Sequence, residues 1–221
     1  MGMGIRTLHM MNKYIHIFYI MIYIIVTTSL FHNNTKRNLQ YSLAIRKLKS
    51  IINNKYKIII VENNGPRNTI LKYSNCTINY TRNNNIRNVN KGYKELKDVW
   101  NCINKYNIKD SDFIVKITGR YILNNNSKFI KELNNLHNTN YDCIIKYGSF
   151  LTPKKYKCSD CITGLIGMRC KYVKRIKLPK IAEWVEWNWA KVTYSIDNKK
   201  ICIINKLGIY VCPGNSKYFL I

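Results

Sequence analysis

The sequence predicts an α/β domain in which a mostly parallel central sheet carries helices on both faces. Short, continuous, β-branched apolar runs recur along the chain, and segments with helical spacing of apolar residues separate them. Strands that alternate with helices form parallel sheets covered on both sides, which gives a three-layer sandwich. A length of 221 residues with 46% hydrophobic residues suits one domain of this kind.

The first apolar run extends from Tyr14 to Phe31 and has two interpretations. Its length of about 18 residues suits a membrane span or a signal segment. The polar end at 27–29 and the lack of charge asymmetry between the flanks weaken that interpretation. The part from Ile22 to Val26 is β-branched and continuous, as in a strand buried on both faces, and we favour a strand.

The domain boundary follows from that choice. Residues 1–20 are an N-terminal extension, with a membrane or signal segment as the alternative, and residues 21–221 form the α/β domain. Later elements are predicted from their periodicity and from turn residues such as 62–66 between them. We expect helices over 38–52, 91–106, 127–136 (with Ser127 as N-cap) and 181–194, and strands over 58–61, 77–80, 113–117, 141–147, 201–204 and 209–211, with a short apolar piece at 164–168.

The charge balance predicts an anionic partner. With 37 Lys and Arg against 11 Asp and Glu, the formal net charge is +26, which attracts nucleic acid, acidic membranes or phosphorylated small molecules. No GxGxxG, Walker or HExxH motif occurs, and the four histidines form no local cluster. Kinase-type sites and hydrolase triads are therefore poorly supported.

The carboxyl ends of the predicted strands are where ligands bind in sheets of this class. Polar residues stand at three of these ends: Thr27-Thr28, Glu62-Asn63 and Thr118-Gly119-Arg120. Arg120 offers a planar guanidinium for phosphate or sugar hydroxyls, and Lys116 lies two residues before Thr118. We expect Thr27, Glu62 and Arg120 to surround one shared hollow.

Other polar groups add candidates and exclusions. Asn90-Lys91-Gly92 opens a helix, and a helix N-terminus of this composition can bind an anion. Asp110-Ser-Asp112 has the spacing of a metal-binding pair but precedes its strand, so we interpret it as a turn and expect no metal there. Cys158 and Cys161 have zinc-ligand spacing without a second pair, and buried free thiols are the simpler interpretation.

Glu186 is the best candidate for a general base among the eleven acidic residues. It lies in the segment Glu183-Trp-Val-Glu-Trp-Asn-Trp189, whose tryptophans suit either a core or a sugar-binding surface. A carboxylate here could take the proton of an acceptor hydroxyl.

The order of these motifs resembles a small, divergent group of glycosyltransferase-like proteins of the kind found in giant viruses and some bacteria. Proteins of this group have the GT-A fold, a Rossmann-like sandwich. The most specific part is Asp112-Phe-Ile-Val-Lys-Ile-Thr-Gly-Arg-Tyr121; Ile24 to Thr28, Gly164 to Arg169 and Val185-Glu-Trp187 match piecewise. The resemblance extends from Met21 to the carboxyl end.

This resemblance implies a glycosyltransferase with a nucleotide-sugar donor and an unknown glycan, protein or lipid acceptor. Thr118-Gly119-Arg120 occupies the place of the usual metal-binding DxD, so the resemblance implies no cofactor, although a divalent metal remains an alternative. Glu186 matches the acidic position near the acceptor. The residues implied in donor binding are Thr27, Thr28, Arg37, Glu62, Asn63, Asn90, Lys91, Gly92, Lys116, Thr118, Gly119 and Arg120.

Two other functions stay open from the sequence. One is a basic nucleic-acid-binding protein, supported by the net charge and by seventeen tyrosines available for stacking. The other is an inactive relative anchored in a membrane through its N-terminus. We expect a cytoplasmic location, in the host cytoplasm if the chain is viral, with membrane anchoring as the alternative.

Overall fold

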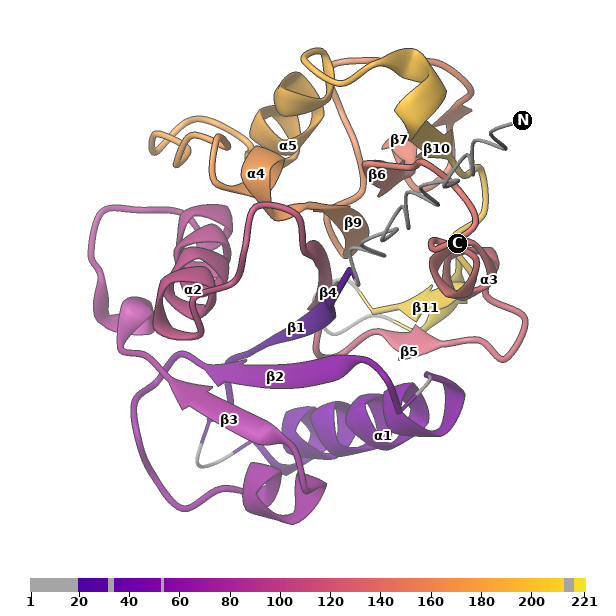
Figure 1. Cartoon of the computed structure of the whole chain (residues 1–221). Helices are drawn as coiled ribbons and strands as arrows, with labels where there is room; N and C mark the ends of the chain where they lie inside the picture. Colours follow the sequence, from indigo (N-terminus) through magenta and orange to yellow (C-terminus); the bar gives the residue numbers. More distant parts are fainter. Residues whose placement is uncertain (1–19, 32–33, 53, 213–216) are drawn as a thin grey trace, which may run out of the picture.

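The computed structural model describes residues 20–31, 34–52, 54–212 and 217–221. Its centre is a seven-stranded sheet with strand order β10-β6-β9-β4-β1-β2-β3 (Figure 1). Four of the six strand pairings are parallel, and only β9 runs against its neighbours β4 and β6. The strands are β1 (Ile22–Thr28), β2 (Lys57–Glu62), β3 (Thr77–Tyr80), β4 (Phe113–Thr118), β6 (Cys143–Ile145), β9 (Leu165–Arg169) and β10 (Ile201–Ile203).

Helices cover both faces of this sheet, as the sequence predicts. The helices are α1 (Thr35–Ile51), α2 (Lys91–Lys105), α3 (Lys128–Asn134), α4 (Cys170–Val173) and α5 (Val185–Thr193), with 3-10 turns η1 (Ile70–Ser74), η2 (Asn83–Asn85) and η3 (Asn198–Lys200). α1 and α3 lie on one face, and α2, α4 and α5 lie on the other (Figure 1). The expected three-layer α/β fold is confirmed.

Strand alternation divides the buried apolar residues into two cores. Ile24 and Val26 of β1 pack toward α1 and α3, whereas Tyr23 and Ile25 pack toward α2, α4 and α5. A continuous β-branched run fills both cores at once, which is why β1, β2 and β4 have no exposed face.

Two small sheets complete the fold. One contains β12 (Phe219–Leu220), β11 (Ile209–Val211) and β5 (Ile122–Leu123), and it lies on the side of α1 and α3. The other is a hairpin of β7 (Tyr147–Gly148) and β8 (Pro153–Lys154). In the first small sheet, β11 near the end of the chain pairs with β5, which follows β4.

The run that could be read as a membrane span becomes a strand over its second half. Ile22–Thr28 forms β1 at the middle of the sheet, so the strand interpretation is confirmed there. The first part of the run, residues 14–19, falls outside the described residues. Within the part that the structure describes, no helix combines the length and the apolar character that crossing a membrane requires.

One predicted element needs correction, and one segment without a prediction forms a strand. The sequence predicts a helix from Ile181, but α5 begins at Val185, because the backbone carbonyls of residues 180, 181 and 183 accept hydrogen bonds from the Asn90 amide instead. The apolar piece at 164–168, for which the sequence predicts no secondary structure, forms most of β9 and runs antiparallel in an otherwise parallel sheet.

Candidate functional site

The carboxyl ends of β1, β2 and β4 lie side by side, as expected. The pairing aligns Thr27 with Thr118 and Thr28 with Glu62. Because side chains alternate along a strand, Thr27 and Thr118 project to the α2–α5 face, while Thr28 and Glu62 project to the α1 face. Thr27 and Glu62 therefore do not line one shared hollow, which corrects that expectation.

Lys116 is the centre of a polar cluster on the α2–α5 face. Its side chain is 3% exposed, and Nζ donates to Glu95 Oε2 at 2.6 Å, to the Thr163 carbonyl at 2.8 Å and to Thr118 Oγ1 at 3.0 Å. An ammonium has three protons, so all its donors are used. The expected contact of Lys116 with a diphosphate would require one of these bonds to break. We name Glu95, Lys116, Thr118, Thr163 and Glu186 the strand-end cluster.

Glu186 joins this cluster from the first turn of α5. The Thr163 hydroxyl donates to its Oε1 at 3.1 Å, and its backbone carbonyl accepts from the buried Cys161 thiol at 3.3 Å. The half-buried carboxylate keeps Oε2 without a hydrogen bond among the described residues. A carboxylate fixed through one oxygen, with the other available, can accept a proton.

Tyr121 lies close enough to Glu95, Glu186 and Arg120 for their charges to act on its hydroxyl. Its ring packs against Gly164, where an added Cβ would lie 2.4 Å from Cε2. Burial, together with the negative charge of Glu95, raises the pKa of Tyr121 to about 12, although the positive charge of Arg120 opposes the shift. The phenol therefore stays protonated and can donate a hydrogen bond at this edge of the sheet.

Glu62 holds the loops that follow β1 and β2. It is fully buried, and its oxygens accept hydrogen bonds from the Thr28 hydroxyl at 2.9 Å, the Leu30 amide at 3.1 Å, the Asn64 side-chain amide at 2.8 Å and Arg67 Nη2 at 3.3 Å. The hydrogen-bond donors around the Glu62 carboxylate are therefore groups of the protein itself. In this structure Glu62 shapes the loops, and the expected contact with base or ribose stays a prediction.

Arg37 and Gly119 lie near Thr28 on the α1 face. The Arg37 guanidinium stacks over the ring of Phe31 at 5.1 Å and donates to the Tyr41 hydroxyl at 3.4 Å. At Gly119, a Cβ would lie 2.8 Å from the Thr28 methyl carbon and 2.9 Å from the Thr27 carbonyl oxygen. Glycine is thus required there for the chain to pass close to β1.

Arg120 follows Gly119 and is covered by the C-terminal part of the chain. Its Nη1 donates to the Cys212 carbonyl at 3.2 Å, and its own carbonyl accepts from the Tyr218 hydroxyl at 3.3 Å. The residue is half-buried and lies at the tip of β4.

The start of α2 is joined to the start of α5. Asn90 caps α2 by accepting from the Tyr93 amide at 2.8 Å, and it donates to the Glu183 carbonyl at 2.7 Å. A Cβ on Gly92 would lie 2.5 Å from Val185, so the two helices touch at this glycine. Lys91 is exposed. Asn90 and Gly92 set the position of Glu186, and their expected approach to a diphosphate stays a prediction.

Asn63 belongs to a buried cluster centred on Asp98 of α2. Asp98 accepts from Thr81 Oγ1 at 2.6 Å, Asn83 Nδ2 at 2.6 Å and Asn63 Nδ2 at 3.3 Å. Burial raises the pKa of Asp98 to about 6, although these hydrogen bonds oppose the shift. The Oδ1 atom of Asn63 is buried and has no hydrogen-bond partner within the described part of the chain. This cluster ties the ends of β2 and β3 to α2.

The acidic pair and the cysteine pair have structural roles. Asp112 accepts from the Met21 and Lys109 amides, and Asp110 accepts from Lys174 Nζ at 2.6 Å, so the pair forms the turn before β4 as expected. Cys158 and Cys161 are free thiols, and burial holds the pKa of Cys161 well above its usual range. Among the described residues, no group of three His, Cys, Asp or Glu side chains is arranged to hold a metal ion.

Sequence reasoning found Glu186, Lys116 and Thr118 but not their partners. Glu95 and Thr163 belong to the strand-end cluster through contacts between different elements, which the sequence does not reveal. Asp98 lies on the buried face of α2. A usable signal existed, because a buried helix face rarely carries a carboxylate and this chain has few of them.

Comparisons with known proteins bear on the fold. No family model matches the chain, and no curated protein matches it in sequence. A mannosyltransferase, PcManGT from Pyrobaculum calidifontis, solved with GDP-Man and Mn2+, superposes with a TM-score of 0.54 at 8% identity, over 86% of this chain and 58% of that one. This chain thus spans less than two thirds of that protein.

A second solved structure is a glycosyltransferase involved in glycosylating the major capsid of PBCV-1. It superposes with a TM-score of 0.44 at 11% identity, over 84% of this chain and 82% of that one, a score too low to establish a common fold. The mannosyltransferase likeness confirms the fold that the resemblance implies, and at 8% identity it establishes the fold alone.

Proposed function

We propose that this chain is a glycosyltransferase that moves a sugar from a nucleotide-sugar donor to a hydroxyl of an acceptor. The observation that carries the proposal is the strand-end cluster: Glu186, fixed through one oxygen, faces the carboxyl end of β4, where sheets of this class bind ligands. The shared fold supports the donor class, since the solved mannosyltransferase holds GDP-Man.

Glu186 is the proposed general base. Its free oxygen takes the proton of the acceptor hydroxyl as the hydroxyl oxygen bonds to the anomeric carbon of the donor sugar. The bond between that carbon and the diphosphate oxygen breaks, and the nucleoside diphosphate leaves with the electron pair. Tyr121, protonated at neutral pH, offers a hydrogen bond to a sugar or acceptor oxygen beside Glu186.

Arg120 is proposed to neutralise the leaving diphosphate in place of a bound metal. Its guanidinium is at the end of β4, and a fixed cation stabilises a leaving group without reorganising. Asp110 and Asp112 lie before the opposite end of the same strand, and Asp112 is roughly 20 Å from Thr118 at the usual rise per residue. They do not fit a metal that must reach a donor beside Thr118.

A donor panel and one matched pair of variants test this function. Thermal shift against uridine-, guanosine- and cytidine-diphosphate sugars identifies the donor, because a ligand that binds the folded state raises the melting temperature. We then expect Glu186→Gln to lower the rate of nucleoside diphosphate release about 100-fold or more with little change in donor affinity.

Glu183→Gln is the control for that experiment. Glu183 lies three residues before Glu186, but its carboxylate accepts from the Lys180 amide on the surface. Its replacement should leave turnover within about twofold, since a surface carboxylate outside the cluster takes no part in the proton transfer. Equal losses in the two variants would refute the role of Glu186, and no shift with any donor would refute the function.

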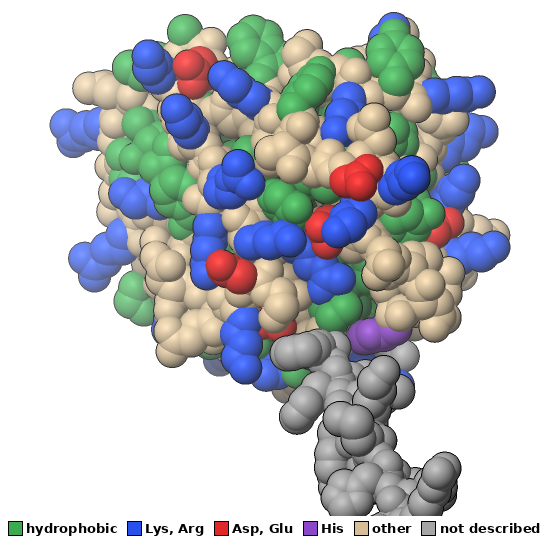
Figure 2. All heavy atoms as spheres, turned by 45° about the horizontal axis from the view of Figure 1, so that its top comes forward, with side chains coloured by type: hydrophobic (Ala, Val, Ile, Leu, Met, Phe, Trp, Pro, Cys, Tyr) green, Lys and Arg blue, Asp and Glu red, His purple; other side chains and the backbone are tan. Residues whose placement is uncertain are grey.

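Nucleic-acid binding is less well supported. A single open stripe of Lys and Arg would favour it. Figure 2 shows Lys and Arg side chains spread over the visible face and interrupted by hydrophobic and acidic side chains. The membrane-anchored alternative concerns residues that fall outside the described part of the chain.

A further inference from the structure

The outer side of α5 and the loop before it carry large apolar side chains in water. Ile181, Trp184 and Trp187 are 69%, 65% and 49% exposed, and they lie within seven residues of one another. Trp184 and Trp187 are three residues apart and so share one side of the helix start. Soluble proteins rarely leave such a concentration of apolar surface uncovered without a partner.

Four cations surround a groove next to these side chains. The groove has a volume of about 440 Å³, and Arg175, Lys177, Lys180 and Lys191 line it together with Glu183, its one carboxylate. Asn188 closes one wall by donating to the Lys177 carbonyl at 2.9 Å. The groove is thus strongly cationic, and Figure 2, which turns this side of the molecule forward, shows Lys and Arg beside hydrophobic side chains.

We propose that this surface, the α5 docking surface, binds the interface of an anionic lipid bilayer. Tryptophan favours the boundary between headgroups and acyl chains, and an aliphatic side chain such as Ile181 gains by entering the acyl region. The cations of the groove attract the phosphates of anionic headgroups. Each cation near the surface should increase the membrane partition coefficient about fivefold.

Two other occupants fit the surface less well. A second copy of this chain carries the same charge of +26, and that repulsion opposes self-association. A nucleic acid could stack on the tryptophans, but Ile181 has no stacking face, and it is the most exposed of the three apolar side chains.

The position of the surface gives it a use. Glu186 lies between Trp184 and Trp187 in the sequence but faces inward to Thr163. A bilayer on the α5 docking surface therefore lies one helix width, roughly 10 Å, from the carboxylate, and an acceptor carried by a lipid would extend round the start of α5 to reach it. This last step rests on the proposed function, whereas membrane docking itself does not.

Sedimentation of the full chain with vesicles tests the proposal, in the absence of any nucleotide-sugar. We expect binding to phosphatidylcholine vesicles that contain phosphatidylglycerol and little binding to phosphatidylcholine alone. Trp184→Ser with Trp187→Ser, and separately Lys177→Glu with Lys180→Glu, should each weaken binding at least tenfold. The tryptophan fluorescence of the unaltered chain should shift to the blue as vesicles are added.

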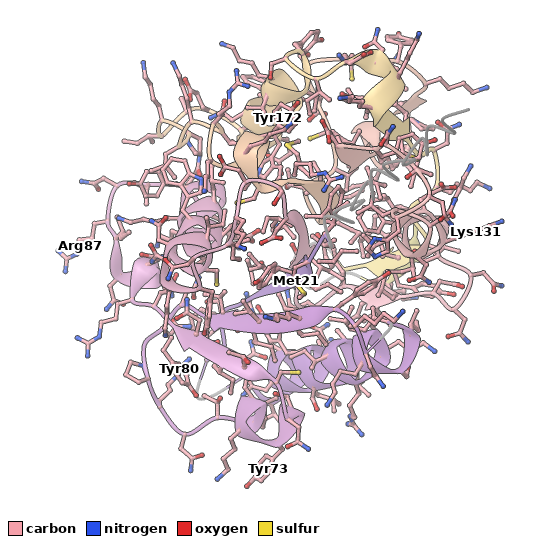
Figure 3. The ribbon with its side chains drawn as sticks, viewed as in Figure 1. Met21, Tyr73, Tyr80, Arg87, Lys131 and Tyr172 are labelled. Carbon is pink, nitrogen blue, oxygen red and sulfur yellow. The ribbon has the colours of Figure 1, made fainter. Side chains whose placement is uncertain are left out.

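Lys128→Glu with Lys131→Glu is the matched control. Both lysines are exposed on α3, the Lys131 side chain projects outward in Figure 3, and the pair makes the same change in net charge. It should retain most of the binding. Because all six altered residues are exposed, the variants should melt near the temperature of the unaltered chain.

Three outcomes would overturn the proposal. The first is vesicle binding that persists in both α5 variants, since it would arise elsewhere in the chain. The second is equal loss in the α3 control, which would show attraction by net charge alone. The third is retention of single-stranded RNA without vesicle binding. Because no donor is present, failure here leaves the proposed transfer reaction to be judged by its own experiment.

Discussion

Two buried lysines at the carboxyl edge of the sheet have opposite surroundings. Lys116 uses its three donors within the strand-end cluster. Lys146, just after β6, is 1% exposed, and its Nζ has no hydrogen-bond partner in the structure. Because burial without a partner disfavours the charged form, the pKa of Lys146 lies below its usual value.

We expect Lys146→Met to raise the melting temperature near neutral pH. Methionine has a similar shape to lysine and removes the unpartnered ammonium. Each kcal/mol gained in the free energy of unfolding should raise the melting temperature by about 2–4 °C. The unfolded chain holds the lysine proton more tightly than the folded one, so the stability of the unaltered protein rises with pH up to the ordinary lysine pKa. The gain from methionine should therefore shrink as pH increases, which calorimetry at two pH values can measure.

Lys116→Met serves as the control for that substitution. It should lower the melting temperature, because it leaves the Glu95 carboxylate and the Thr163 carbonyl without their donor. If both methionine variants were destabilised to the same extent, Lys146 would have to hold a partner in solution, contrary to its surroundings here.

At the scale of elements, α2 holds the loops after β2 and β3 through Asp98. Since the pKa of this carboxyl is raised from 3.8 to about 6, the folded state binds its proton more tightly than the unfolded state. The resulting contribution to stability is full below about pH 3.8 and is lost as pH rises through about 6. Each tenfold difference in proton affinity between the two states corresponds to roughly 1.4 kcal/mol.

Asp98→Asn should remove that pH dependence. The melting temperature of the unaltered protein, relative to the Asn variant, should fall between about pH 4 and pH 7, because other titrating groups cancel in the comparison. Thermal melts across this range measure the difference. A constant difference at every pH would show that the Asp98 carboxyl titrates as it does in the unfolded chain.

The contact between α2 and α5 is just as specific. An alanine at position 92 would place its Cβ 2.5 Å from Val185, so Gly92→Ala should displace the start of α5, cost about 1–3 kcal/mol and lower turnover through Glu186. Adding Val185→Gly makes room for the new methyl group. Unfolding in urea and the rate assay should both show partial recovery in the double variant, and simple additivity would argue against the contact.

The elements of the fold could be predicted where local sequence decides them. β1, β2 and β4 were predicted to within two residues, since a continuous β-branched run in a two-sided core leaves little choice. The direction of β9 could not be predicted, because the pattern of apolar residues is the same for a parallel and an antiparallel strand. The start of α5 was missed because a distant side chain, Asn90, binds the carbonyls before it.

The candidate site was predictable in part for the same reason. Strand order in an α/β sheet brings Thr27, Thr28, Glu62 and Thr118 to one edge, and the sequence predicts this edge. The ion pair of Lys116 with Glu95 links a strand and a helix, and only packing decides it. The hydrogen bonds that the Leu30 and Asn64 amides donate to Glu62 likewise depend on how the loops pack.

Across the whole molecule, acidic groups at the two ends of the sheet have different surroundings. At the amino end of β4, Asp110 and Asp112 are engaged by Lys174 and by backbone amides, and nearby Asp142 pairs with Arg169. At the carboxyl end, Glu95 and Glu186 lie in the strand-end cluster with Lys116, and Arg120 follows the end of β4. The tip of β4 therefore carries a fixed cation, which we propose faces a donor diphosphate.

This arrangement predicts that transfer depends on Arg120 and not on a divalent metal. Arg120→Ala should weaken nucleotide-sugar binding at least tenfold, as expected when a charged hydrogen bond to phosphate is lost. Arg87→Ala removes the same charge from a side chain that projects outward in Figure 3, and it should leave binding unchanged.

Prolonged dialysis against a chelator should leave turnover within about twofold, since the carboxylates of Asp110 and Asp112, which could bind a metal, lie at the wrong end of β4. Loss of turnover that added Mn2+ or Mg2+ restores would instead place a metal beside Glu95 and Glu186, and Arg120 would then have to act on the sugar or on the fold of the C-terminal segment that covers it.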